Sequence, residues 1–136
     1  KLVNLVERYN LNKKIKFVSH CKEMPLAYSL SDVVVSASIE PEAFGRISVE
    51  AQSMGKPIIA SNIGGSKETI INKKTGLLYK HNDPRELAKN LNTVIQLSLD
   101  ELKSMGNEGR KNIAKKFDVE TMCQSNLKEY KRLIKN

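Results

Sequence analysis

The chain has 136 residues, of which 40% are hydrophobic and 28% charged, so it is long enough for one domain with its own core. Its longest apolar run, at 33–35, is far too short to span a membrane. The net charge of +8 is spread over the chain, with 12 basic and 7 acidic residues up to position 80 and 11 and 8 after it, which argues against a nucleic-acid-binding protein.

Strand-like and helix-like segments alternate through the first 80 residues. Predicted helices cover 2–9, 25–30, 44–54 and 67–71, and predicted strands cover 15–18, 32–36, 57–60 and 76–79. Pro25 suits the first turn of its helix, and Gly55 suits the end of one. The continuous β-branched run within 32–36 indicates a strand that is covered on both faces.

Three further helices follow, and polar side chains mark where each one begins. Asp83 with Glu86 has the form of a capping box, Ser98 with Glu101 repeats that pattern, and Asp118 can cap the last helix. Apolar residues then recur at helical spacing: Leu87, Leu91, Val94 and Ile95; Leu102, Met105, Ile113 and Phe117; Met122, Leu127, Tyr130 and Leu133. Because such stripes usually belong to a core, we expect all three to be buried.

Strands separated by helices predict right-handed βαβ units, and therefore an α/β fold with a mainly parallel sheet. Only about four strands are predicted and the series begins abruptly, so we expect at least one unfinished sheet edge. The chain starts at Lys1 rather than Met, which is compatible with a leader or a whole domain ahead of it.

The segment 38–51 lies just past the carboxyl end of a predicted strand and runs into a helix, which is where parallel α/β sheets bind ligands. A helix N-terminus offers unpaired N–H groups to a phosphate, and Gly45 lets an anion approach the backbone. The residues alone leave two roles open for Gly45 and Glu42. Both belong to a ligand site, or Gly45 only permits a tight turn while the charge of Glu42 interacts favourably with the dipole of the helix.

Two glutamates define the ligand that this segment would suit. Glu50, inside the predicted helix, can accept hydrogen bonds from two vicinal hydroxyls, as proteins often do with a ribose. Glu42, ahead of the helix, can reach the hydroxyls of a sugar beyond the phosphates. A molecule with ribose, diphosphate and hexose in that order fits this spread, and it is a nucleotide sugar.

An ordered series of motifs consists of Glu42-x7-Glu50 with Phe44-Gly45 inside it, then residues 50–60, then Gly64-Gly65-x-x-Glu68. In this series the chain resembles the C-terminal domain of family 4 retaining glycosyltransferases. The variant at 40–46 is most similar to bacterial members that build lipopolysaccharide or other surface polysaccharides. The likeness covers nearly all of the chain. It implies a Rossmann-like parallel sheet with flanking helices, the incomplete C-terminal half of a two-domain GT-B enzyme. Residues 1–136 would be its nucleotide-sugar-binding domain, lacking the first strands and the N-terminal acceptor domain.

The resemblance also implies roles for single residues. Glu50 would bind the ribose, and Glu42 would be the catalytic residue, in contact with sugar hydroxyls near the reacting carbon. The backbone N–H groups of Phe44, Gly45 and Arg46, with Ile47 beside them, would hold the diphosphate and the donor sugar. Ser19 and His20 would lie near the base, and Ser19 stands where the family usually has Gly. The Arg and Lys with which the family stabilises the leaving diphosphate fall before Lys1.

No metal or other cofactor is expected, because Cys21, Cys123, His20 and His81 lack the spacing of metal ligands. The expected partners are a nucleotide sugar and the missing acceptor-binding domain. The diffuse positive charge suits anionic phosphates or an anionic membrane surface, so we expect a cytoplasmic protein that can associate peripherally with the inner face of the membrane.

Three functions remain open for the chain by itself. The first is the donor domain of a glycosyltransferase, whose parent transfers a hexose with retention to a polysaccharide or lipid-linked acceptor. The second is a catalytically inactive nucleotide-sugar-binding module or gene remnant. The third is a basic α/β interaction domain whose glutamates only cap a helix.

Overall fold

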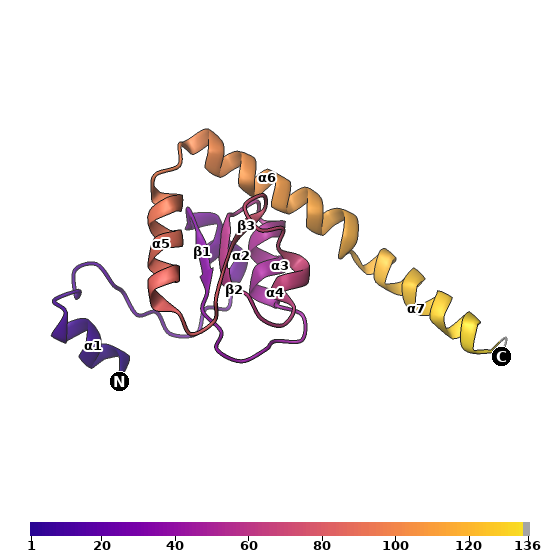
Figure 1. Ribbon diagram of the computed structural model, residues 1–136, viewed down its shortest axis with the longest axis horizontal. Helices are drawn as coiled ribbons and strands as arrows, with labels where there is room; N and C mark the ends of the chain where they lie inside the picture. Colours follow the sequence, from indigo (N-terminus) through magenta and orange to yellow (C-terminus); the bar gives the residue numbers. More distant parts are fainter. Residues whose placement is uncertain (135–136) are drawn as a thin grey trace.

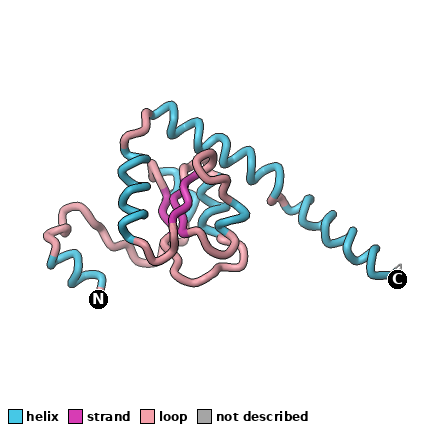
Figure 2. Tube along the Cα trace, viewed as in Figure 1, coloured by secondary structure: helices cyan, strands magenta, loops and turns pink. Residues whose placement is uncertain are grey.

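The computed structural model describes residues 1–134 and confirms an α/β fold around a parallel sheet (Figure 1). The strands are β1 (Val34–Ser36), β2 (Ile58–Ser61) and β3 (Gly76–Tyr79), hydrogen-bonded in that order. The helices are α1 (Leu2–Arg8), α2 (Met24–Leu30), α3 (Arg46–Ser53), α4 (Ser66–Thr69), α5 (Pro84–Ile95), α6 (Leu99–Lys116) and α7 (Val119–Ile134). Figure 2 shows the strands grouped at the centre of the body, with helices around them.

Two apolar clusters cover the two faces of the sheet. The first joins Ile58 and Ala60 of β2 to Tyr28 of α2, Ala51 of α3 and Ile70, which follows α4. The second cluster consists of Ile59, Leu77, Tyr79 and Val94, with Leu87, Leu91 and Leu102 packed against it. All four residues of β2 are buried, as a strand covered on both faces requires.

The strand at 32–36, predicted to be covered on both faces, is covered only in part, because β1 is an edge strand; Val34 packs against the first cluster and Val33 against the second. Val35 is 39% exposed, and Val33 and Val34 are only partly buried. A β-branched run indicates a strand, but burial on both faces needs neighbours that the sequence pattern does not specify.

The opposite edge of the sheet is covered by side chains. The Asn72 Oδ1 atom accepts a hydrogen bond from the Leu78 N–H at 3.0 Å, and the Asn90 side chain donates to the Leu78 carbonyl at 3.2 Å. Glu86 accepts from the Lys80 N–H at 2.7 Å. These contacts satisfy the outer groups of β3, so that this edge is protected against further strand pairing.

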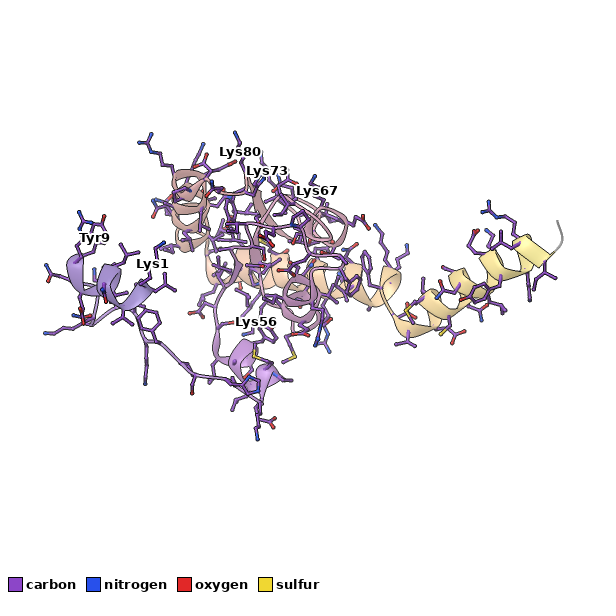
Figure 3. All side chains as sticks on the ribbon, turned by 90° about the horizontal axis from the view of Figure 1, so that it is seen from below. Lys1, Tyr9, Lys56, Lys67, Lys73 and Lys80 are labelled. Atoms are coloured by element: carbon purple, nitrogen blue, oxygen red, sulfur yellow. The ribbon has the colours of Figure 1, made fainter. Side chains whose placement is uncertain are left out.

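The strand predicted at 15–18 is absent, since those residues are coil without ladder pairing. They belong to an N-terminal arm that extends from the body with α1 (Figure 3). Leu5, Val6, Leu11, Ile15 and Phe17 line an apolar groove within this arm. An apolar run becomes a strand only where a partner supplies backbone hydrogen bonds, and the described residues offer none here.

The three predicted helix starts are observed. Asp83 accepts from the N–H groups of Arg85 and Glu86, and Ser98 with Glu101 forms a reciprocal capping box. Asp118 accepts from the Thr121 N–H at 2.9 Å. The first site is not a capping box, because the Glu86 carboxylate bonds to Lys80 at the end of β3 rather than to Asp83.

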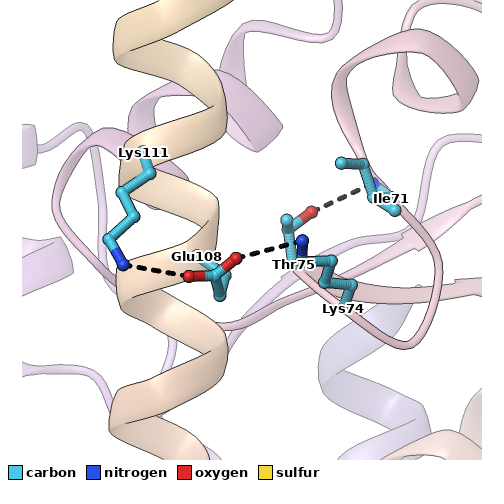
Figure 4. Close-up of polar contacts among 5 residues, drawn as sticks. All are labelled: Ile71, Lys74, Thr75, Glu108 and Lys111. Atoms are coloured by element: carbon cyan, nitrogen blue, oxygen red, sulfur yellow. Dashed lines mark hydrogen bonds and ion pairs between the residues drawn. The ribbon is translucent and has the colours of Figure 1, made fainter.

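Helix α6 packs tightly on α3 through two glycines, Gly106 and Gly109, with no side chain to hold the helices apart. The Thr69 carbonyl then accepts from both Gln52 of α3 and Asn112 of α6, each at 3.1 Å. Glu108 of α6 pairs with Lys111 on the same helix at 3.1 Å and with Lys74, in the loop before β3, at 3.2 Å (Figure 4). Hydrogen bonds from Lys111 and then Lys74 lower the pKa of the Glu108 carboxyl.

The apolar stripe of α7 is exposed, contrary to the prediction that it belongs to the core. Met122, Leu127, Tyr130 and Leu133 are each at least 45% exposed, and α7 has no buried residue. Figure 1 shows the reason, since α7 leaves the body and extends away from it. Ile95 at the end of α5 is likewise 76% exposed. No helix within 1–134 is long and apolar enough to cross a bilayer.

Candidate functional site

The loop after β1 and the start of α3 form the candidate site. Helix α3 begins at Arg46, two residues later than predicted, and Gly45 is its N-cap with φ 73° and ψ 54°. The Gly45 carbonyl accepts from the N–H groups of Ser48 and Val49, at 3.0 and 3.2 Å. The N–H groups of Arg46 and Ile47 lie in the first turn, where a helix has no internal acceptor for them. No side chain caps this helix, so its positive end is available to an anion.

A glycine turn between β2 and α4 fixes the loop in place. The Gly65 N–H donates to the Glu42 carbonyl at 2.8 Å. A Cβ on Gly64 would lie 2.3 Å from that carbonyl oxygen, and one on Gly65 would lie 2.3 Å from the Phe44 carbonyl carbon. Both positions therefore need glycine, because a side chain would push the loop away. The Gly64-Gly65 turn thus holds residues 42–44 against the body.

Glu50 lies on α3, one turn beyond Arg46, with both carboxylate oxygens engaged. Its Oε2 atom accepts from the Tyr28 hydroxyl at 2.9 Å, and its Oε1 atom accepts from the Arg46 guanidinium at 3.0 Å. Burial, followed by the hydrogen bond to Glu50, raises the pKa of Tyr28 to about 12. The hydroxyl therefore stays a donor at neutral pH.

A groove of about 480 Å³ opens beside Glu50, between α2 and α3. Its walls are Lys22, Met24, Pro25, Tyr28, Arg46, Val49, Glu50, Ser53 and Met54. An apolar wall with a few polar groups is the usual lining of a small-molecule site.

The other predicted residues are distributed around the same loop. Glu42 is partly buried and accepts a short hydrogen bond from the Ser38 hydroxyl. Phe44 is 46% exposed and meets Phe117 edge to face, with ring centroids 6.0 Å apart. Ile47 is 39% exposed.

Ser19 and His20 lie in an exposed coil ahead of α2. Neither residue lines the groove beside Glu50, whose first lining residue in the chain is Lys22. The structure places Glu42, Phe44, Gly45, Arg46, Ile47 and Glu50 on one loop and helix start, and among residues 1–134 no hydrogen bond or ion pair joins them to Ser19 or His20.

Sequence reasoning assigned no role to Tyr28 or Ser38, which hold the two glutamates. Tyr28 is 22 positions from Glu50, so no local pattern joins them. Ser38 is four positions from Glu42 in an irregular loop, where no fixed spacing brings side chains together. Within residues 1–134, no three His, Cys, Asp or Glu side chains form a cluster suited to a metal ion.

Comparison with known proteins identifies relatives of this chain. The family described as glycosyl transferases group 1 matches residues 1–112. The capsular polysaccharide biosynthesis glycosyltransferase CapM of Staphylococcus aureus is 29% identical over 87% of this chain and 32% of its own length. Spore coat protein SA of Bacillus subtilis is 30% identical over 87% of this chain and 31% of its own length. The chain thus spans about a third of these relatives.

Solved structures share the fold. A glycosyltransferase from Rickettsia africae matches with a TM-score of 0.88 and 36% identity, over 98% of this chain and 35% of its own. HepE of Anabaena in complex with UDP matches with a TM-score of 0.89 and 28% identity, over 96% of this chain and 36% of its own. HepE in complex with UDP-glucose matches with a TM-score of 0.86 at the same identity and coverage.

Proposed function

This chain belongs to the group 1 glycosyl transferases, and from that membership we propose that it is the part of such an enzyme that binds a nucleoside diphosphate sugar. Its neighbours among solved structures are GT-B glycosyltransferases, which agrees with the expected Rossmann-like fold class. The parent enzyme would transfer the sugar with retention to a polysaccharide or lipid-linked acceptor. The names of CapM and its relatives support the polysaccharide class.

The observation that carries the proposal is the uncapped N-terminus of α3 followed, on the same helix, by the Glu50 carboxylate. The N–H groups at 44–46 and the helix dipole would hold the diphosphate, with the Ile47 backbone beside them. Glu50 would accept hydrogen bonds from the ribose hydroxyls. Glu42, ahead of the helix, would contact the donor sugar near the reacting carbon, and the coil at Ser19 and His20 would lie near the base.

Charge on the leaving diphosphate would be met by the α3 dipole and by basic side chains, without a metal ion. The remaining two-thirds of the relatives' length supports a further domain as partner, one that would bind the acceptor. A cytoplasmic position at the inner face of the membrane would suit a lipid-linked acceptor, and the net charge of +8 favours an anionic surface.

The test is a calorimetric titration of the folded chain with UDP, GDP, ADP and their sugars. We expect saturable binding of one base. Glu50→Ala should weaken it by about tenfold or more, because a carboxylate's hydrogen bonds to two hydroxyls are lost. Glu129→Ala is the matched control, since it removes an exposed glutamate that is also paired with an arginine on its own helix, at 2.9 Å. Equal affinity in wild type and Glu50→Ala would refute the ribose assignment.

A further inference from the structure

Tyr28 joins the core of the protein to Glu50. The residue is only 5% exposed, and its ring packs in the cluster with Ala51, Ile58, Ala60 and Ile70. Its hydroxyl emerges from that cluster and donates to the Glu50 Oε2 atom at 2.9 Å. A ring that is almost fully buried against a close-packed core has little freedom, so the position of its hydroxyl is fixed with it.

The second partner of Glu50 differs in this respect. The Arg46 side chain is 83% exposed, on the same helix and four residues away. An exposed pair of this kind holds its geometry weakly, because solvent and rotamer freedom compete with it. Arg46 can therefore leave Glu50 without disturbing the fold, whereas Tyr28 cannot.

We propose that Tyr28 is a positioning residue, which holds the Glu50 carboxylate in the orientation that receives the two ribose hydroxyls of the nucleotide. The inference rests on the proposed function, since it assigns Tyr28 a part in ribose recognition. Tyr28 does not touch the ribose itself but acts through Glu50.

The stereochemistry of the carboxylate agrees with this role. An ionised carboxylate accepts about four hydrogen bonds, two on each oxygen. Tyr28 and Arg46 occupy one site on each oxygen, which leaves one site on each for a diol. Without Tyr28 the carboxylate would rotate about its side-chain bonds. Binding would then carry the entropy cost of fixing it, and the affinity for the ribose would fall, as happens when a supporting hydrogen bond is removed from a binding group.

The test compares two probes, UDP and 2′,3′-dideoxy-UDP, by titration calorimetry on the 136-residue chain. Tyr28→Phe keeps the ring and removes only the hydroxyl. Tyr79→Phe is the matched control, because Tyr79 is 4% exposed in the other core cluster and its loss of a hydroxyl leaves Glu50 untouched. Glu50→Ala and the double variant Tyr28→Phe/Glu50→Ala complete a double-mutant cycle.

We expect Tyr28→Phe to bind UDP about three- to tenfold more weakly than wild type while binding the dideoxy probe as wild type does. In the Glu50→Ala background, the Tyr28 substitution should have no additional effect on UDP binding, because no acceptor is left for its hydroxyl to hold. Tyr79→Phe should match wild type with both probes. A merely structural role for Tyr28 would weaken both probes alike.

Two failures are distinguishable. If wild type binds no nucleotide, the proposed function is overturned, and this inference with it. If wild type binds UDP and loses affinity in Glu50→Ala, but Tyr28→Phe binds UDP as wild type does or weakens both probes equally, the role of Tyr28 alone is overturned and the ribose assignment of Glu50 stands.

Discussion

Gly106 lies where α6 crosses α3, and its replacement by alanine tests how that contact holds the helix that carries Glu50. In an exposed helix, Gly→Ala stabilises by about 1 kcal/mol, because alanine loses less backbone entropy. Here an added Cβ would lie 1.9 Å from the Gly55 carbonyl oxygen. Helix α6 and the turn at Gly55, just past the end of α3, would have to separate by about 1.5 Å to restore an ordinary contact, and overpacking of this size costs about 1–3 kcal/mol or more. We therefore expect Gly106→Ala to lower the free energy of unfolding by about 2 kcal/mol.

The assay is urea denaturation followed by circular dichroism, with Gly109→Ala as the control on the same helix. A Cβ at Gly109 would meet the Cγ atom of the buried Gln52 side chain at 3.0 Å and its Cβ atom at 3.3 Å, a much smaller overlap than that of Gly106 with a backbone carbonyl. Gly109→Ala should therefore lower the free energy of unfolding by less than Gly106→Ala does, because the gain in helix propensity offsets a small overlap. If Gly106→Ala is as stable as wild type, or more stable, the close approach of α6 to Gly55 is refuted.

Two further predictions concern the edge of the sheet and the pH dependence of stability. Asn90→Ala removes the side chain that donates to the Leu78 carbonyl, and Asn92→Ala is its control, because Asn92 is exposed on the same helix and its replacement gives the same gain in helix propensity. We expect the Asn90 variant to be about 1 kcal/mol less stable than the Asn92 variant. Equal thermal midpoints of the two variants would contradict this. The pKa of Tyr28 is about 12 in the folded protein against 10.0 for a free tyrosine, so its contribution to stability is complete below pH 10 and is lost as the pH rises towards 12. Between pH 10 and pH 12 the free energy of unfolding should therefore fall less in Tyr28→Phe than in wild type. If urea denaturation gives the same pH dependence for both proteins, the raised pKa is refuted.

The local features of the fold were predictable from sequence. Asp83, Ser98 and Asp118 begin their helices as predicted, because a cap depends on residues two or three positions away. The parallel sheet followed from alternating strands and helices, and three of the four predicted strands are present within two residues of their expected bounds. Glu42, Gly45 and Glu50 could be named as a candidate site because they lie on one loop and helix start.

The contacts that join distant residues could not be predicted in this way. The strand expected at 15–18 has no partner among residues 1–134, and the stripe on α7 has no surface to cover it, although both segments have the pattern of buried elements. Periodicity shows which face of an element is apolar, but only the neighbouring elements decide whether that face is buried.

The class of fold could be predicted from the order of strands and helices along the chain, and the helix starts and the glutamates of the candidate site from patterns of a few residues. The contact of Tyr28 with Glu50, 22 positions away, and that of Gly106 with Gly55 appear only in the folded protein. These contacts follow from the packing of α2 and α6 around α3, and packing depends on the whole set of side chains at once.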